Sequence, residues 1–299
     1  MEQTFMKEKK ILPLVLSMSL PMMLSMLVNS LYNIVDSYFV AQISEQAMTA
    51  LSLVYPLQLL ETAIAVGFGV GMNAAAAYYL GAKEQQRADD IVTSGLILSL
   101  LHGVILMAAT LLFAPAFVSL FTENEKILAD GVKYSNLVFI FAVPNVIAIT
   151  FEKIFQAEGR MKVSMLSMLC GCVANIILDP LLIFGIGIFP KMGIEGAAIA
   201  TGIGQVIPLI VYLFVFIKYP VSLHFHWHKK NFQKRLVAQM YGVGIPATLN
   251  LALPSFMITA LNGILAVYSA SYVLVLGIYY KLQTFIYLSA NGIVQGCLL

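Results

Sequence analysis

Residues 11–41 read ILPLVLSMSLPMMLSMLVNSLYNIVDSYFVA, and Asp36 is the only charged residue in this stretch. A helix that crosses a membrane needs about 20 mostly apolar residues. At ~1.5 Å per residue this stretch would form a helix ~45 Å long, which exceeds the ~30 Å hydrocarbon core of a bilayer. The stretch therefore predicts a membrane-spanning helix that tilts, protrudes or bends. Pro21 is the expected bending point, because proline removes a helical hydrogen bond.

The composition of the whole chain extends this prediction beyond the first stretch. Of the 299 residues, 60% are hydrophobic and 11% are charged, whereas about 25% are charged in an ordinary soluble domain. So little charge leaves too few polar side chains to cover a water-exposed surface, which excludes a soluble enzyme and a disordered chain. The net charge of +2 gives no support for a nucleic-acid partner. We expect lipid to be the surrounding solvent.

Eight apolar segments are long enough to be spans, which predicts an all-α polytopic membrane protein. They are Ile11–Ala41, Ala47–Leu80, Ile91–Phe113, Val132–Phe151, Val163–Ile188, Gly196–Ile217, Val237–Tyr268 and Tyr272–Leu299.

The loops between these segments alternate in charge. The N-terminal segment and the loops after the second, fourth and sixth spans hold most of the basic residues, including Lys153, Arg160 and Lys162 after the fourth span. The other loops hold only Lys126, Lys133 and Lys191. Because cytoplasmic loops are enriched in Lys and Arg, the N-terminus and the basic loop 219–235 are predicted to be cytoplasmic. That basic loop could instead be a lipid-headgroup patch, but a topology determinant is the preferred interpretation.

The chain also matches itself when its sequence is shifted by one constant offset, without any gap. The matched pairs include Pro21 with Pro246, Tyr55 with Tyr280, Gln58 with Gln283, Gly67 with Gly292, and Gly71 with Gly296. Six spans separate equivalent points, so the two copies share one orientation, as in parallel transporter repeats. This predicts a six-helix lobe over 1–225 and the first two helices of a second lobe over 226–299. Two full copies would need about 450 residues by this offset, so we expect a truncated chain or a complementing chain that supplies four helices.

Ionisable residues within spans are costly and are therefore hypotheses for functional sites. They are Asp36, Glu61, His102, Asp179 and Lys281. Glu61 is expected either to line an aqueous path or to pair with Lys281. Lys281 either snorkels to the membrane surface or lines the cavity, and His102 is expected to be a satisfied or interfacial histidine.

Polar residues accompany two of these acids at helical spacing. Asn33 precedes Asp36 by three positions, and Asn175 precedes Asp179 by four, so each pair shares a helix face. In the next span Thr201 and Gln205 are also four apart. Together these residues form an oxygen-rich set that suits a hard monovalent cation or a transferable proton. The alternative is that they only hydrogen-bond between helices.

Several kinds of chemistry find no support in the sequence. Gly67-x-Gly69-x-Gly71 lies within a span rather than after a strand, so it predicts close helix packing and not a dinucleotide site. There is no P-loop and no catalytic constellation. We therefore expect a protein that is not an enzyme and that uses no organic cofactor.

The motifs resemble those of the multidrug and toxic compound extrusion family. They are Ser19-Leu-Pro21 with Tyr32-Asn-x-x-Asp36, Leu80-Gly-Ala-Lys83, Gln156-Ala-Glu-Gly159-Arg160, Asn175-x-x-x-Asp179-Pro180, Gly193-x-x-Gly196-Ala-Ala-x-Ala-Thr201, and Gly244-Ile-Pro246. The resemblance implies twelve helices in two six-helix lobes, in the cell membrane. It also implies a cavity that opens alternately to each side, through which proton or sodium gradients drive export of cationic, amphipathic compounds.

Carried over to this chain, the resemblance implies a cation or proton site formed by Asp36, Asn175, Asp179 and Thr201. Tyr32 would lie near the site, and Pro21 would bend the first span. Two other functions stay open: a non-transporting fragment or partial subunit, and a flippase for lipid-linked precursors, which ranks lower because Lys281 is the only cation available in the spans.

Overall fold

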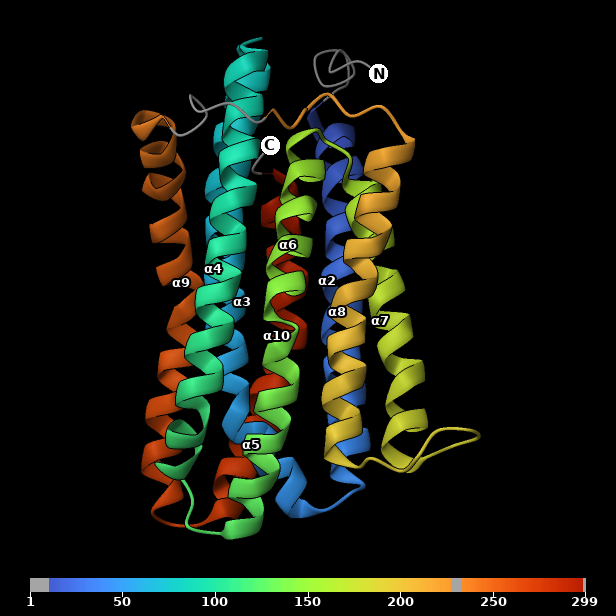
Figure 1. Ribbon diagram of the computed structural model, residues 1–299, viewed down its shortest axis with the longest axis vertical. Helices are drawn as coiled ribbons and strands as arrows, with labels where there is room; N and C mark the ends of the chain where they lie inside the picture. The colour runs from blue at the N-terminus through green and yellow to red at the C-terminus, as the bar shows by residue number, and fades with distance from the viewer. Residues whose placement is uncertain (1–10, 227–232, 298–299) are drawn as a thin grey trace.

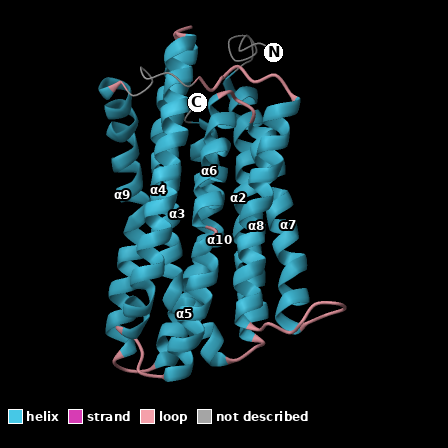
Figure 2. Cartoon of the chain, in the orientation of Figure 1, coloured by secondary structure: helices cyan, strands magenta, loops and turns pink. Residues whose placement is uncertain are grey.

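The computed structural model describes residues 11–226 and 233–297, and within them the chain is helical throughout apart from turns and loops (Figure 1, Figure 2). The helices are α2 (Ile11–Ala41), α3 (Glu45–Gly81), α4 (Gln85–Ser119), α5 (Glu125–Ile140), α6 (Ala142–Ala157), α7 (Met161–Phe184), α8 (Ile194–Lys218), α9 (Lys234–Ala266) and α10 (Ala270–Cys297). They stand roughly side by side in one upright bundle. The predicted fold class, an all-helical polytopic membrane protein, is confirmed.

Each of the eight predicted spans corresponds to a helix, or in one case to a bent pair of helices, in the part of the chain that the structure describes. Six helices are long and apolar enough to cross a membrane, and the bent pair α5 and α6 together makes a seventh. The remaining helix, α10, covers most of the predicted span Tyr272–Leu299, whose last two residues lie outside the described residues. It packs along α2 and α3.

The fourth predicted span, Val132–Phe151, is not one straight helix. The chain breaks at Phe141, and α5 and α6 meet there at an angle of 48°. Pro144 gives the physical reason, because its ring clashes with the carbonyl four residues earlier, at Ile140, and it has no N–H to donate. The helix restarts with the Asn145 N–H donating to the Phe141 carbonyl at 3.0 Å. The sequence analysis missed this break.

The turns alternate between the two ends of the bundle, as the charge pattern predicted. The turns α3–α4, α6–α7 and α8–α9 lie at one end, and the turns α2–α3, α4–α5, α7–α8 and α9–α10 lie at the other (Figure 1). At the first end, the segment after α8 is held against the bundle by Glu158, whose Oε1 accepts the N–H groups of Ser222 at 2.6 Å and Leu223 at 2.9 Å. Burial raises the pKa of the Glu158 carboxyl, although these N–H groups oppose the shift.

Glycines allow α3 and α9 to touch backbone to backbone, which confirms the prediction made from the Gly67-x-Gly69-x-Gly71 pattern. A Cβ atom on Gly71 would clash with the Met240 carbonyl oxygen and would lie 2.8 Å from the Gly244 nitrogen. A Cβ atom on Gly67 would lie 2.6 Å from the backbone of Thr248. The absence of side chains at these positions therefore sets the distance between α3 and α9.

Replacing Gly71 with alanine should separate these two helices. We expect Gly71→Ala to lower stability by about 1–3 kcal/mol, the usual cost of overpacking, even though alanine favours helix more than glycine does. The matched control is Gly242→Ala in α9, where an added Cβ meets no atom within 4 Å. Thermal unfolding of the purified variants measures the difference. Equal melting temperatures for the two variants would contradict this account of the contact.

Candidate cation-binding site

Two buried carboxylates lie at the centre of the predicted site. Asp36 of α2 is 4% exposed and Asp179 of α7 is 0% exposed. The helices α2 and α7 pack against each other, and this brings the two acids close enough for their charges to interact. Two like charges in a bundle with so little water are unfavourable unless a cation or a proton accompanies them.

Asn175 and Thr201 join the acids from α7 and α8. The Asn175 amide nitrogen lies 3.3 Å from Asp179 Oδ1. The amide orientation that satisfies both of its polar atoms places its nitrogen 3.2 Å from Asp179 Oδ2 and its oxygen 3.2 Å from the Thr201 N–H. The predicted four-residue spacing of Asn175 and Asp179 therefore puts them in direct contact, and Thr201 meets them from the next helix.

Three side-chain oxygens on α2 and α8 lack a hydrogen-bond partner among the residues that the structure describes. They are Asp36 Oδ1, Thr201 Oγ1 and Gln205 Oε1, all of them buried. An unsatisfied buried acceptor is costly, so these atoms suit a ligand that brings positive charge or a proton. An oxygen-only donor set is the kind that hard cations prefer. The predicted sodium or proton site fits this chemistry.

Two tyrosines flank the acids. Tyr32, predicted to lie near the site, is close enough to Asp36 and Asp179 to interact with both. Tyr134 of α5 also interacts with both acids, and its hydroxyl lies 3.4 Å from the Gln58 amide. Sequence reasoning missed Tyr134, because a single tyrosine in an apolar helix carries no signal of the site that it faces. Asn33, by contrast, donates its amide to the Asn29 carbonyl within α2, at 3.0 Å.

Glu61 and Lys281 have different partners. Glu61 accepts the Asn145 amide at 3.1 Å. Lys281 donates instead to the Ser37 hydroxyl, and its ammonium lies 5.3 Å from the centre of the Tyr55 ring. Of the two alternatives for Glu61, the structure does not show the pairing with Lys281, because α10 turns Lys281 toward α2; the other, lining an aqueous path, stays a prediction. Lys281 is 4% exposed, so it does not snorkel to the surface.

A second polar cluster lies on α6, where the sequence predicted a loop cation. Lys153 is 1% exposed, and its ammonium lies 3.0 Å from Glu152 Oε1 and 3.0 Å from Gln156 Oε1. The Gln156 amide also donates to Glu152 Oε1, at 2.6 Å. The assignment of Lys153 to a loop is wrong, because α6 continues to Ala157 and keeps these side chains inside the bundle. The four-residue spacing of Glu152 and Gln156 was the signal available in the sequence.

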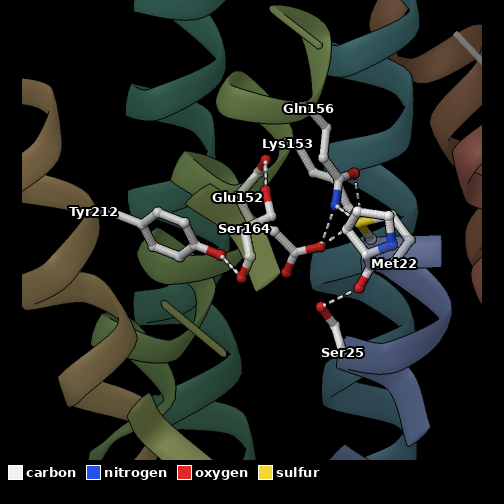
Figure 3. Close-up of polar contacts among 8 residues, drawn as sticks. Met22, Ser25, Glu152, Lys153, Gln156, Ser164 and Tyr212 are labelled. Atoms are coloured by element: carbon white, nitrogen blue, oxygen red, sulfur yellow. Dashed lines mark hydrogen bonds and ion pairs between the residues drawn. The ribbon is translucent and has the colours of Figure 1, made fainter. Parts of the chain in front are cut away.

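Figure 3 shows this cluster beside the segment of α2 around Pro21. The Gln156 amide lies 3.5 Å from the Met22 sulfur, and the Ser25 hydroxyl donates to the Pro21 carbonyl at 2.8 Å. The helix α2 runs through Pro21 without a break. A bend at Pro21 therefore stays a prediction, and the α6 cluster is the group that touches this part of α2.

Removing the Lys153 charge should destabilise the bundle. Lys153→Met keeps most of the side-chain volume but leaves Glu152 buried without its cation, which we expect to cost about 3–5 kcal/mol. The exposed pair of Lys133 and Glu195, at 3.2 Å, supplies the matched control, and Lys133→Met should change stability by about 1 kcal/mol or less. Thermal unfolding compares the two. A loss for Lys153→Met no larger than that of the control would rule out a role for the buried charge.

Comparison with known proteins agrees with the motifs. The MatE family model matches residues 21–181. The multidrug export protein MepA of Staphylococcus aureus (strain NCTC 8325 / PS 47) is 29% identical over 299 residues, which cover 99% of this chain and 65% of MepA. The chain thus spans about two thirds of the length of that relative.

Solved structures give the same result. The outward-facing form of a multidrug resistance MATE family transporter of the MOP superfamily aligns over 95% of this chain and 62% of its own, at 25% identity and a TM-score of 0.82. A MATE crystallised in complex with MaD3S aligns over 95% of this chain and 63% of its own, at 25% identity and a TM-score of 0.81. The family model covers more than half of the chain, and the chain belongs to the MatE family, that of the multidrug and toxic compound extrusion transporters.

Proposed function

We propose that the chain forms the ion-coupling part of a secondary active antiporter, which exports cationic or amphipathic compounds in exchange for protons or sodium ions. The observation that carries this proposal is the buried pair Asp36 and Asp179, together with buried oxygens of Asp36 and Thr201 that lack hydrogen-bond partners among the described residues. The name of MepA, a multidrug export protein, supports the class of substrate.

The charges of the site provide a mechanism for the exchange. Without a bound cation, two carboxylates face each other in a poorly hydrated bundle and repel. A sodium ion or a proton that enters from outside neutralises this repulsion and stabilises the arrangement in which α2, α7 and α8 lie close together. Because a ligand shifts a conformational equilibrium only by its differential affinity, this coupling requires the site to change between the two states of the transporter. The α2 segment around Pro21 is the proposed moving part.

We further propose that residues 1–225 form the first lobe and residues 226–299 begin the second. The helix bounds support this division. The offset that pairs Pro21 with Pro246 also pairs Glu45, the start of α3, with Ala270, the start of α10. The packing supports it too, since α3 lies against α9 while α10 lies against α2. An exchange of helices of this kind is what a twofold relation between two lobes would produce.

Efflux of a cationic fluorescent dye from cells that lack other exporters tests the proposed exporter. For the exporter, Asp36→Asn should reduce efflux at least tenfold with unchanged expression, because it removes the charge that the coupling ion neutralises. Glu123→Gln, which removes an exposed acid from a loop, is the control and should transport normally. Efflux by Asp36→Asn at the normal rate would refute the coupling role.

We also propose that the end of the bundle carrying Arg160 and the segment 219–226 faces the cytoplasm, with the N-terminus on the same side. The concentration of basic residues at this end supports the orientation. In intact cells, a cysteine introduced at Ile188, which is exposed at the opposite end, should react with a membrane-impermeant thiol reagent, whereas one at Tyr219 should not. The reverse labelling pattern would overturn the orientation.

A further inference from the structure

Lys281 is a buried cation that the second-lobe helix α10 places beside the acidic site of the first lobe. Its ammonium donates to the Ser37 hydroxyl, next in sequence to Asp36. The ammonium makes no direct ion pair with Asp36, but it is near enough for the two charges to attract each other. Ser37 donates its own proton to the Asn33 carbonyl at 2.7 Å, so its lone pairs are free to accept from Lys281. The contact therefore joins α10 to α2 at the position where the coupling ion is proposed to bind.

The surroundings of Lys281 leave its charge little else to interact with. The ring of Tyr55, on α3, lies 5.3 Å away and offers a weaker cation–π contact. Glu61, the other buried acid on α3, is occupied by Asn145. Asp36 keeps one oxygen, Oδ1, without a hydrogen-bond partner among the described residues. A buried ammonium needs a counter-charge, and Asp36 is the acid with which it interacts.

The pair is also absent from the internal repeat. The offset that pairs Pro21 with Pro246 places Pro56 opposite Lys281 and Leu261 opposite Asp36. The acid thus belongs to the first copy alone and the cation to the second copy alone. The two charges are complementary across the proposed lobe boundary rather than being duplicated features of each lobe.

We propose that Lys281 is a tethered cation that competes with sodium, as the coupling ion, for Asp36. This inference rests on the proposed function of the Asp36 site. In the arrangement seen here the ammonium supplies the positive charge beside Asp36 and holds α10 against α2. A mobile cation bound at Asp36 displaces this charge by repulsion and weakens the contact between α10 and α2. Lys281 is accordingly a positioning residue that links ion binding in the first lobe to the placement of the second.

A double-mutant cycle tests the pair without any transport assay. The melting temperatures of the purified wild-type chain, Asp36→Asn, Lys281→Met and the double variant are compared. We expect each single variant to melt at least about 5 °C lower, since each leaves a buried charge without its partner, and the double variant to regain at least half of that loss. The control cycle combines Glu61→Gln with Lys281→Met and should be additive. Additive losses for Asp36 and Lys281 would overturn the pairing.

A sodium titration tests the competition. The melting temperatures of wild-type chain and Lys281→Met are followed with increasing sodium chloride, against choline chloride at the same ionic strength. The sodium concentration that gives half of the full stabilisation should be at least about threefold lower for Lys281→Met than for the wild type. The reason is that in Lys281→Met no ammonium has to be displaced from Asp36 before sodium binds. Lys281→Arg, which keeps the charge, should behave like the wild type.

The outcomes separate this inference from the proposed function. An identical sodium dependence for the wild type and Lys281→Met, including no dependence in either, would overturn the competition. If efflux still requires Asp36 in that case, the proposed function stands and only the role of Lys281 fails. The reverse outcome is also distinguishable. If the mutant cycle is coupled and sodium stabilises Lys281→Met at a lower concentration than the wild type, the pairing and its displacement stand. If efflux is nevertheless unaffected by Asp36→Asn, the proposed function is refuted.

Discussion

Asp36 and Asp179 are like charges held together inside a bundle that lipid surrounds, and much of the polar structure of the chain is arranged around them. Water is not available to solvate the two carboxylates, so neighbouring helices must supply the compensation. Asn175 and Thr201 contribute polar atoms from α7 and α8, and Lys281 contributes a charge from α10. These polar groups face the two acids only if each helix keeps a fixed rotation about its own axis.

Close packing between helices makes this precision possible. The helices α3 and α9 approach until their backbones touch, because Gly67 and Gly71 present no side chains to α9. In the same way, a Cβ atom on Gly277 of α10 would lie 2.6 Å from the Ser52 Cβ atom of α3. Lipid provides no hydrophobic force to press helices together, so small residues at their contacts carry much of the association. These contacts fix the position of α10, and with it the position of Lys281.

The α6 helix places a second set of charges within the membrane. Glu152, Lys153 and Gln156 satisfy one another, and this differs from the main site, where acceptor oxygens lack partners among the described residues. A satisfied cluster stabilises one arrangement, whereas an unsatisfied one favours the entry of a ligand. The two polar groups on α2, around Met22 and around Asp36, therefore have different roles. The α6 cluster contacts α2 beside Pro21 through Met22, and the group around Asp36 is the proposed cation site.

The sequence by itself determined the helical membrane fold, the alternation of the loops, and the oxygen-rich faces that carry Asp36, Asn175 and Asp179. These features are local, because apolar length and the spacing of three or four residues along a helix can be read directly from the chain. Glu61 and Lys281 were recognised as buried charges, but their partners could not be predicted. Which residue faces another across two helices depends on the rotation and vertical register of both helices.

Tertiary structure alone decided the partner of Lys281, the burial of Lys153 and the presence of Tyr134 at the acidic site. The rotation and vertical register of each helix are set by contacts such as the one between Gly71 and Met240. Such contacts join residues far apart in the chain and leave no periodic signal in the sequence. The break at Phe141 is different, because Pro144 was visible in the sequence. Proline occurs within other helices of this bundle that continue without a break, among them α2 and α3, so only the packed structure shows which proline interrupts a helix.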